Sequence, residues 1–441
     1  MVKKHWIPVL GALSLSSLLT CCAPPGTSPT AGSPQSCAWS ATPVTYPAST
    51  IPATSAGSYD TLSGIAAITP NDLWAVGSYA THLTTSGWPY NAVFVEHSDG
   101  KQWTPYSAPD ALDAGKFSGD SLSAVAGSSA TDIWAVGMIG NTGDSLTPPS
   151  QTLTEHFNGS SWSIVNAPDA YLGSSQGSDD LSGVAVLSPS NAWAVGTAAW
   201  NSSLAIDSSF TMGLVEHWDG TRWNVVTLPS PVPSLTAAAW SILNSPTAAL
   251  PTQAIGSWSL SGIDALSASN IWVVGSETPN VTTTLSEPRT LVEHWNGSTW
   301  NIVPTPDLTL NEPMFDNSRR ATDSLTAITG TSSDNLWAVG GALPQGTLTL
   351  HWDGSSWKII PSPTTGNVRS YGNATPLTSA AATGSAVWSV GAVLMEWNGA
   401  EWKPMYTVNG QQYGNLTGVA APNSADLWAV GNEAILHRHC G

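Results

Sequence analysis

One repeating unit of short apolar segments constrains this chain more than any other feature, and it is most complete between residues 260 and 304. These segments are rich in β-branched and aromatic residues and are separated by turn residues, which is typical of β-strands. We expect four strands, A to D, in each unit. In this copy they cover Leu260–Ala265, Ile271–Gly275, Thr290–Trp295 and Ser298–Val303. Because a lone four-stranded sheet cannot bury both of its faces, the unit must pack against copies of itself.

The turn between strands C and D carries the strongest local signal. Asn296-Gly297 is typical of a two-residue type I′ hairpin, because both residue types tolerate a positive φ. An Asn-Gly or Asp-Gly pair recurs in the other units, and a Trp follows three residues after each Gly. These tryptophans are Trp103, Trp162, Trp223, Trp300, Trp357 and Trp402. The sequence therefore predicts six complete C–D hairpins.

The strand B signature, Trp-(Ala/Val/Ser)-Val-Gly, occurs seven times. Its tryptophans are Trp74, Trp134, Trp193, Trp272, Trp337, Trp388 and Trp428. An Asp or Asn stands two residues before six of them, and Ala386 replaces it in the sixth copy. We expect this Asx side chain to hydrogen-bond the backbone of the A–B turn, which is a structural role and not a catalytic one.

The seventh copy stops before its strand D, and the missing strand is found near the other end of the chain. Aligned on the hairpins, Cys440 takes the Asn position and Trp39 takes the strand D Trp position. A last sheet completed in this way shuts the ring and leaves no sheet edge open. We therefore predict an all-β, seven-bladed β-propeller over residues 37–441, with four antiparallel strands per blade.

Cys37 and Cys440 are predicted to lie across this join. A disulfide between them would lock the ring, and an exported protein can form one. The alternative is two unpaired thiols near loose termini.

Residues 1–36 read as an export and tethering segment. Lys3 and Lys4 precede an apolar stretch, residues 6–20, that is too short to span a bilayer comfortably, so residues 1–21 are predicted to be a signal peptide. The end Leu19-Thr20-Cys21-Cys22 resembles a bacterial lipobox, which implies a diacyl anchor on Cys21 or Cys22 and a place at the cell surface. The alternative is a secreted protein with two incidental cysteines. Residues 22–36, rich in Pro, Ser, Thr and Gly, are expected to be a tether.

Charge excludes one class of partner. With 12 Lys and Arg against 30 Asp and Glu, the formal net charge is −18, whereas nucleic-acid binding needs the opposite sign. The charge is spread thinly and is expected to keep the protein soluble, and we expect a monomer.

The repeats resemble those of bacterial extracytoplasmic β-propellers of the kelch-like and Asp-box (BNR) kinds, over residues 37–441. The turn Asp219-Gly220-Thr221-Arg222-Trp223 is similar to an Asp-box but lacks the residue between Asp and Gly. The Gly-Gly doublet of kelch repeats is also missing, because Trp-Ala-Val-Gly stands in its place. The resemblance implies the fold and carries no catalytic residue over to this chain.

The long inserts are predicted to lie at one end of the ring. In an antiparallel blade the B–C and D–A connections leave from one end, and the A–B and C–D turns from the other. Every long, non-repeating insert is a B–C or D–A connection, and such loops on a rigid scaffold are where binding usually occurs. The alternative is that they are spacers.

Four tryptophans outside the repeat positions are predicted to lie in these loops: Trp88, Trp200, Trp240 and Trp258. An exposed indole offers a flat apolar face for a sugar ring or a partner's side chain, so we expect a glycan or a protein ligand here. The alternative is that these rings cap small cores within the loops. Four arginines share this end: Arg289, Arg319, Arg320 and Arg369.

A sialidase-like glycoside hydrolase or lyase on the same scaffold is the main alternative function, and a purely structural envelope protein is the second. The hydrolase would use Glu312, Asp316 and Tyr371 with the arginines. No cofactor and no metal site is predicted, although His437 and His439 share a strand face and form a possible ligand pair in competition with the disulfide. The sequence thus favours a non-enzymatic surface binding module.

Overall fold

A computed structural model describes most of the chain beyond residue 36. The described residues are 37–47, 60–83, 89–111, 119–140, 150–170, 177–201, 209–231, 256–279, 288–306, 322–342, 346–363, 376–405, 408, 413, 415–432 and 434–440. Cys37–Gly441 forms one compact unit, and Met1–Ser36 is a separate unit outside the described residues. The described part consists of strands, turns and connecting segments, and it holds no helix that could cross a membrane.

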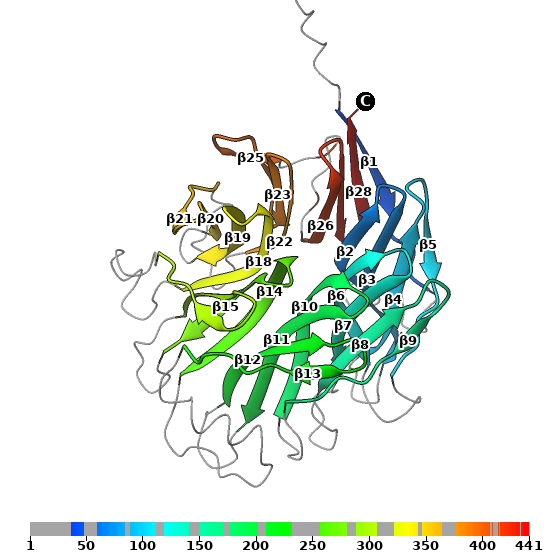
Figure 1. Ribbon diagram of the computed structural model, residues 1–441. Helices are drawn as coiled ribbons and strands as arrows, with labels where there is room; N and C mark the ends of the chain where they lie inside the picture. The colour runs from blue at the N-terminus through cyan, green and yellow to red at the C-terminus, as the bar shows by residue number, and fades with distance from the viewer. Residues whose placement is uncertain are drawn as a thin grey trace, which may run out of the picture. The chain divides into compact units, whose positions relative to one another are not determined.

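Seven four-stranded antiparallel sheets make up the compact unit (Figure 1). Blade 1 contains β2 (Thr61–Thr69), β3 (Asp72–Leu83), β4 (Pro89–Ser98) and β5 (Trp103–Tyr106). Blade 2 contains β6 (Asp120–Ser129), β7 (Asp132–Ile139), β8 (Gln151–Phe157) and β9 (Trp162–Ile164). Blade 3 contains β10 (Gly177–Ser188), β11 (Asn191–Asn201), β12 (Ser209–Trp218) and β13 (Trp223–Val225). Blade 4 contains β14 (Ser257–Ser267), β15 (Asn270–Thr278), β16 (Arg289–Trp295) and β17 (Trp300–Ile302).

The remaining blades follow the same order. Blade 5 contains β18 (Asp323–Ser332), β19 (Asn335–Ala342), β20 (Gly346–Trp352) and β21 (Trp357–Ile359). Blade 6 contains β22 (Leu377–Thr383), β23 (Ala386–Gly391), β24 (Leu394–Trp397) and β25 (Trp402–Met405). Blade 7 contains β26 (Leu416–Asn423), β27 (Asp426–Gly431), β28 (Ala434–Cys440) and β1 (Cys37–Pro43). Each strand A contacts the strand A of both neighbouring blades, and β26 contacts β2, so the seven-bladed ring predicted from the repeats is confirmed.

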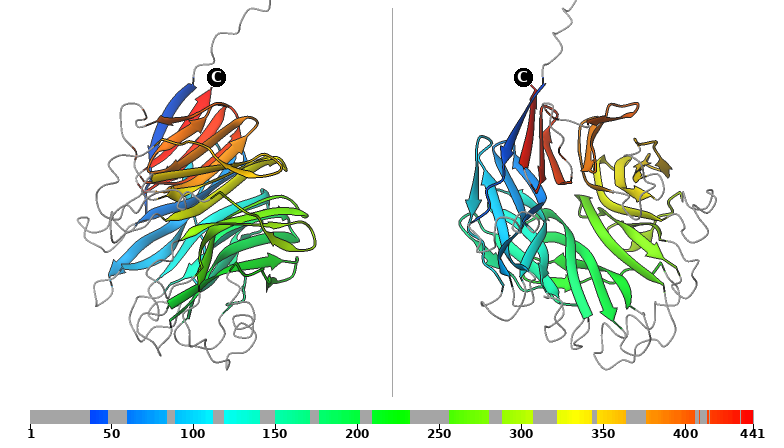
Figure 2. Two further views of the ribbon diagram at one scale, coloured as in Figure 1. Left: turned by 90° about the vertical axis from the view of Figure 1, so that its left-hand side faces the viewer. Right: turned by 180° about the vertical axis from the view of Figure 1, so that it is seen from behind.

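The first strand of the compact unit completes its last blade. Strand β1 lies beside β28, where the blue and red ends of the chain run side by side in both views (Figure 2). In their register Trp39 lies opposite Arg438, as Trp223 lies opposite Trp218 in blade 3. The alignment of Cys440 with the turn Asn is wrong by one residue, because the register puts His439 at that position. The predicted disulfide between Cys37 and Cys440 is present.

Tryptophans pack from blade to blade around the ring. The strand B Trp of one blade meets the strand D Trp of the next edge to face, with ring centroids 5.0 to 5.9 Å apart. The pairs are Trp74–Trp162, Trp134–Trp223, Trp193–Trp300, Trp272–Trp357, Trp337–Trp402 and Trp428–Trp103. The guanidinium of Arg438, at the strand C Trp position of blade 7, lies 4.8 Å above the ring of Trp388 in blade 6. Edge-to-face is one of the two arrangements that aromatic pairs prefer, and the same contact joins six pairs of neighbouring blades.

The strand B Asx has a different partner from the one expected. In blade 4 the Oδ1 atom of Asn270 accepts hydrogen bonds from Trp272 Nε1 and from His294 Nε2, both at 2.8 Å. The indole and imidazole rings stack at 4.1 Å. The expectation that Asx binds the turn backbone is therefore wrong, while its structural role stands. The strand C histidines are held by this acceptor within their own sheets.

The C–D connection is a four-residue loop and not the expected two-residue type I′ turn. Trp295 pairs with Trp300, which leaves four residues between them. Gly297 has a φ of +93°, but Asn296 is not among the positive-φ residues. The Oδ1 atom of Asn296 instead accepts hydrogen bonds from the backbone N–H groups of Ser298 and Thr299, both at 3.0 Å. The Asx side chain therefore shapes this loop, and only the glycine needs the left-handed conformation.

Candidate functional site

The two ends of the ring differ in the connections that they carry. At one end, the turn end, A–B turns have two residues, as between Ser267 and Asn270, and the C–D loops have four. At the other end, the loop end, the connections vary in length, and some are short, as between Gly391 of β23 and Leu394 of β24. A long one separates β13, which ends at Val225, from β14, which begins at Ser257. Antiparallel strand order places all B–C and D–A connections there, as predicted.

Most of the predicted site residues lie outside the described residues. These are Trp88, Trp240, Arg319, Arg320, Arg369, Glu312, Asp316, Tyr371, Cys21 and Cys22. Trp200 lies in β11, opposite Gly177 of β10 and Phe210 of β12 in the register. Arg289 is the first residue of β16, is exposed, and lies opposite Glu277.

Trp258 is a core residue, so the prediction that it forms an exposed platform in a loop is wrong. It lies in β14 and is 2% exposed. A Cβ atom on Gly213 would come within 2.8 Å of Trp258 Nε1, so the glycine leaves room for the indole. Trp258 stands two residues before Leu260, where blades 2 and 5 have Asp120 and Asp323 before their own leucines. That alignment is the signal by which the sequence could have placed it.

An axial channel of about 260 Å³ runs between the seven strands A. Each blade gives it one hydroxyl-bearing residue, one Gly, Ala or Ser, and one Ile, Val or Ala. The hydroxyl-bearing residues are Ser63, Ser123, Ser182, Ser261, Thr326, Thr378 and Thr417. The Oγ1 atom of Thr378 donates to the carbonyl of Leu416 in the next blade at 2.9 Å. Thr417 bonds the carbonyl of Leu62 in the same way, across the closure of the ring.

The chemistry of this channel is limited by its lining. All 21 lining residues are hydroxyl-bearing, aliphatic or glycine residues, and none of their side chains titrates near neutral pH. General acid–base catalysis needs a group that exchanges a proton with the substrate. The described channel can therefore hold water or a small polar molecule, but its walls supply no acid or base.

Four buried glutamates are functional-group candidates that sequence reasoning missed. Glu96, Glu155, Glu216 and Glu293 each precede the strand C histidine, one in each of blades 1 to 4. Burial raises the pKa of Glu293 to about 8. Burial, with the nearby charges of Asp110 and Asp120, raises the pKa of Glu155 to about 8. The repeated Glu-His pair was the available signal. One acid per blade indicates a repeated structural position and not a single catalytic pair.

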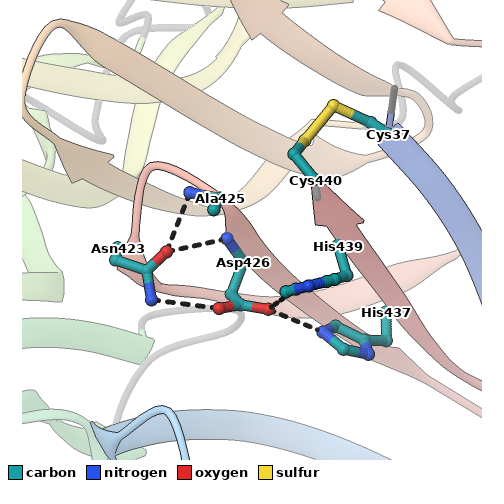
Figure 3. Close-up of a disulfide and its surroundings, with 7 residues drawn as sticks. All are labelled: Cys37, Asn423, Ala425, Asp426, His437, His439 and Cys440. Carbon is teal, nitrogen blue, oxygen red and sulfur yellow. Dashed lines mark hydrogen bonds and ion pairs between the residues drawn. A yellow bond between two sulfur atoms is a disulfide. The ribbon is translucent and has the colours of Figure 1, made fainter. Parts of the chain in front are cut away.

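A different cluster lies at the seam of blade 7. Among the described residues, Asp426, His437 and His439 are the only set of three potential metal ligands whose atoms lie within 4.8 Å of one another. Asp426 Oδ1 is 3.0 Å from His437 Nε2 and 2.7 Å from His439 Nδ1 (Figure 3). The imidazole pair seen in the sequence therefore meets a carboxylate, while Cys440 is held in the disulfide.

Comparisons with known proteins leave the function open. No family model matches the chain, and no curated protein does. Solved structures are similar along most of the chain. The structure of YCF48 bound to D1 peptide has 15% identity and a TM-score of 0.47, covering 91% of this chain and 97% of that one. A streptogramin B lyase has 13% identity and a TM-score of 0.49, covering 92% and 98%. An α-L-arabinanase of Penicillium chrysogenum complexed with arabinobiose has 12% identity and a TM-score of 0.40, covering 87% of this chain and 95% of that one.

Proposed function

We propose that this chain is an exported, non-enzymatic binding module that takes a glycan or a protein ligand at its loop end. The observation that carries the proposal is the difference between the two ends of the ring. The turn end repeats the same short connections blade after blade, whereas the loop end has connections of very unequal length and holds all the long ones. A closed, Trp-packed ring is a rigid support for such loops, and binding usually occurs on variable loops of a rigid scaffold.

The axial channel supports binding over catalysis. Its lining has no titratable group, and the buried glutamates of blades 1 to 4 are spread over four sheets. A glycoside hydrolase needs two carboxyl groups on either side of one bond. The hydrolase alternative therefore depends on Glu312, Asp316 and Tyr371, which lie outside the described residues.

We assign ligand contacts to Trp88, Trp200 and Trp240 with the arginines Arg289, Arg319, Arg320 and Arg369. Indole faces stack on sugar rings, and guanidinium groups donate several hydrogen bonds to hydroxyl or carboxylate oxygens. This combination favours a glycan, and a protein partner is the second choice. Trp258 is left out because it is buried.

Export and anchoring belong to the same proposal. A disulfide is stable in oxidising compartments, so the Cys37–Cys440 bond supports an extracytoplasmic location. A diacyl group on Cys21 or Cys22 and a tether over residues 22–36 would hold the ring at the cell surface. The disulfide lies at the turn end, away from the proposed ligand end.

The test is a triple variant, Trp88→Ala/Trp200→Ala/Trp240→Ala, compared with the unchanged chain on a glycan array and in capture of surface proteins. We expect the unchanged chain to bind a glycan and the triple variant to bind it at least about tenfold more weakly, since each stacked aromatic contributes about 1 kcal/mol or more. A control variant at the turn end, Lys101→Ala, should bind as the unchanged chain does. If the triple variant bound as tightly as the unchanged chain, the proposal would be wrong. Release of sugar products from a bound glycan would favour the hydrolase instead.

A further inference from the structure

Blade 7 places a second imidazole where every complete hairpin has a turn residue. In blades 1 to 5 a single strand C histidine meets the strand B Asx, as His294 meets Asn270. Strand C then turns towards strand D at an Asx residue. In blade 7 strand D comes from β1, so β28 has no turn to make and runs on to Cys440. His439 therefore lies two residues beyond His437, on the same strand face, and opposite Asp426 in the register.

The three side chains converge on one point. Asp426 Oδ1 lies 3.0 Å from His437 Nε2 and 2.7 Å from His439 Nδ1. In tetrahedral coordination, metal–nitrogen and metal–oxygen bonds of about 2.0–2.2 Å place neighbouring ligand atoms roughly 3.3–3.6 Å apart. The three ligand atoms lie within 4.8 Å of one another, so side-chain rotations can bring them to that spacing, and a bound ion would replace the two shared hydrogen bonds.

The supporting contacts are those expected around a metal ligand. Asn423 Nδ2 donates to Asp426 Oδ2 at 3.0 Å, which leaves Oδ1 for the imidazoles (Figure 3). The ring of Trp428 stacks on His437 at 3.7 Å, with an angle of 5° between the ring planes. The disulfide fixes the end of the strand that carries His439. Such outer contacts orient metal ligands and set their affinity.

The carboxylate of Asp426 also differs from the strand B Asx of blades 1, 3 and 4. The indoles Trp74, Trp193 and Trp272 each donate to their own strand B Asx. Trp428 Nε1 is buried and has no hydrogen-bond partner. Asp426 is thus committed to the two imidazoles and Asn423.

We propose that Asp426, His437 and His439 bind a divalent transition-metal ion of the zinc type at the seam of the ring. Two imidazoles and one carboxylate suit Zn²⁺ and its neighbours in the first row, and not Ca²⁺ or Mg²⁺, which prefer oxygen ligands. The His439 side chain is 59% exposed, so the ion has a route in and keeps water as its remaining ligand. The net charge of −18 favours a cation.

The experiment is a titration of the full chain with ZnSO₄ by isothermal calorimetry, without reductant and with free thiols alkylated so that Cys21 and Cys22 do not compete. We expect one Zn²⁺ per chain at pH 7.5 and no comparable binding of Mg²⁺. His439→Ala should weaken the Zn²⁺ site by at least about tenfold. Because this side chain is exposed, the variant is expected to fold, and its unfolding temperature without metal checks that.

His294→Gln is the matched control, since it changes a strand C histidine in a blade that has only one. We expect it to retain the Zn²⁺ site. Zn²⁺ should raise the unfolding temperature of the unchanged chain and of His294→Gln, but not that of His439→Ala. No binding by the unchanged chain would overturn the proposal. So would equal binding by His439→Ala, because the ion would then lie elsewhere.

Discussion

Cys37 lies directly opposite Cys440 in the register of β1 and β28, and a disulfide joins the two residues. This bond crosses 403 positions of sequence at the one point where the ring is not continuous along the chain. All other blades are closed by a covalent hairpin, so blade 7 depends on pairing between remote strands. The disulfide is therefore the covalent counterpart of the missing turn.

Removing this bond should destabilise the ring. We expect Cys37→Ser/Cys440→Ser to lower the free energy of unfolding by about 2–5 kcal/mol, since a cross-link restricts the unfolded chain. Urea unfolding followed by tryptophan fluorescence measures the change. Cys21→Ser/Cys22→Ser is the control and should leave the midpoint where it is. An unchanged midpoint in the first variant would mean that β1 holds by its strand pairing alone.

Asn270→Ala should cost about 1–3 kcal/mol, because it leaves the donors of Trp272 and His294 without their shared acceptor. The measurement is the shift in urea midpoint. Asn301→Ala is a suitable control, since Asn301 is exposed and bonds only to Thr299 nearby. We expect it to stay within about 0.5 kcal/mol of the unchanged chain. Equal effects from the two variants would contradict the structural role given to the Asx.

Trp258→Ala should destabilise the fold by about 3–5 kcal/mol, as expected for a large aromatic side chain removed from a core. An exposed binding platform would give the opposite result, with unchanged stability and lost binding. The smaller variant Gly213→Ala should also destabilise, because its new methyl group would meet the indole of Trp258. Thermal unfolding of both variants distinguishes these outcomes.

Stability should fall as the pH rises through the neutral range. Burial raises the pKa of Glu293 from 4.5 to about 8. The folded chain therefore keeps a proton that the unfolded chain releases above about pH 4.5. This group imposes no cost below that pH, and its cost grows until about pH 8.

Glu293→Gln removes this cost, so its stability relative to the unchanged chain should increase by at least about 1 kcal/mol between pH 5 and pH 9. Urea unfolding at both values measures the difference. Glu401→Gln, at an exposed position, should show no such change. A constant difference between Glu293→Gln and the unchanged chain would show that Glu293 ionises freely in the folded state.

The number of blades and the closure of the ring could be predicted because they follow from counting. Seven strand B tryptophans and six hairpins leave one strand missing, and Trp39 supplies it. The local geometry of the C–D connections is harder to predict from the sequence. The pair Asn296-Gly297 fits two loop types, and only the pairing of Trp295 with Trp300 decides between them. Strand D was predicted over Ser298–Val303 and covers Trp300–Ile302, because the loop takes its first two residues.

The candidate site could be predicted only in part. The repeat predicts that strand A begins at Leu260, which leaves Trp258 in a loop, whereas β14 begins at Ser257. The loop-end residues have no copies in other blades, so no repeat could locate them. The seam cluster combines Asp426 with two histidines from the next strand. The histidines were recognised as a pair, but their carboxylate depends on the pairing of β27 with β28.

The sharing of blade 7 between the two ends of the compact unit also sets an order of assembly. A ribosome makes β1 before the other strands and β28 after them, so the ring cannot close until β28 has been synthesised. Until then the backbone N–H and C=O groups of β1 have no strand partner. A product that terminates before β28 would never pair them. Closure of the ring therefore depends on the synthesis of both β1 and β28.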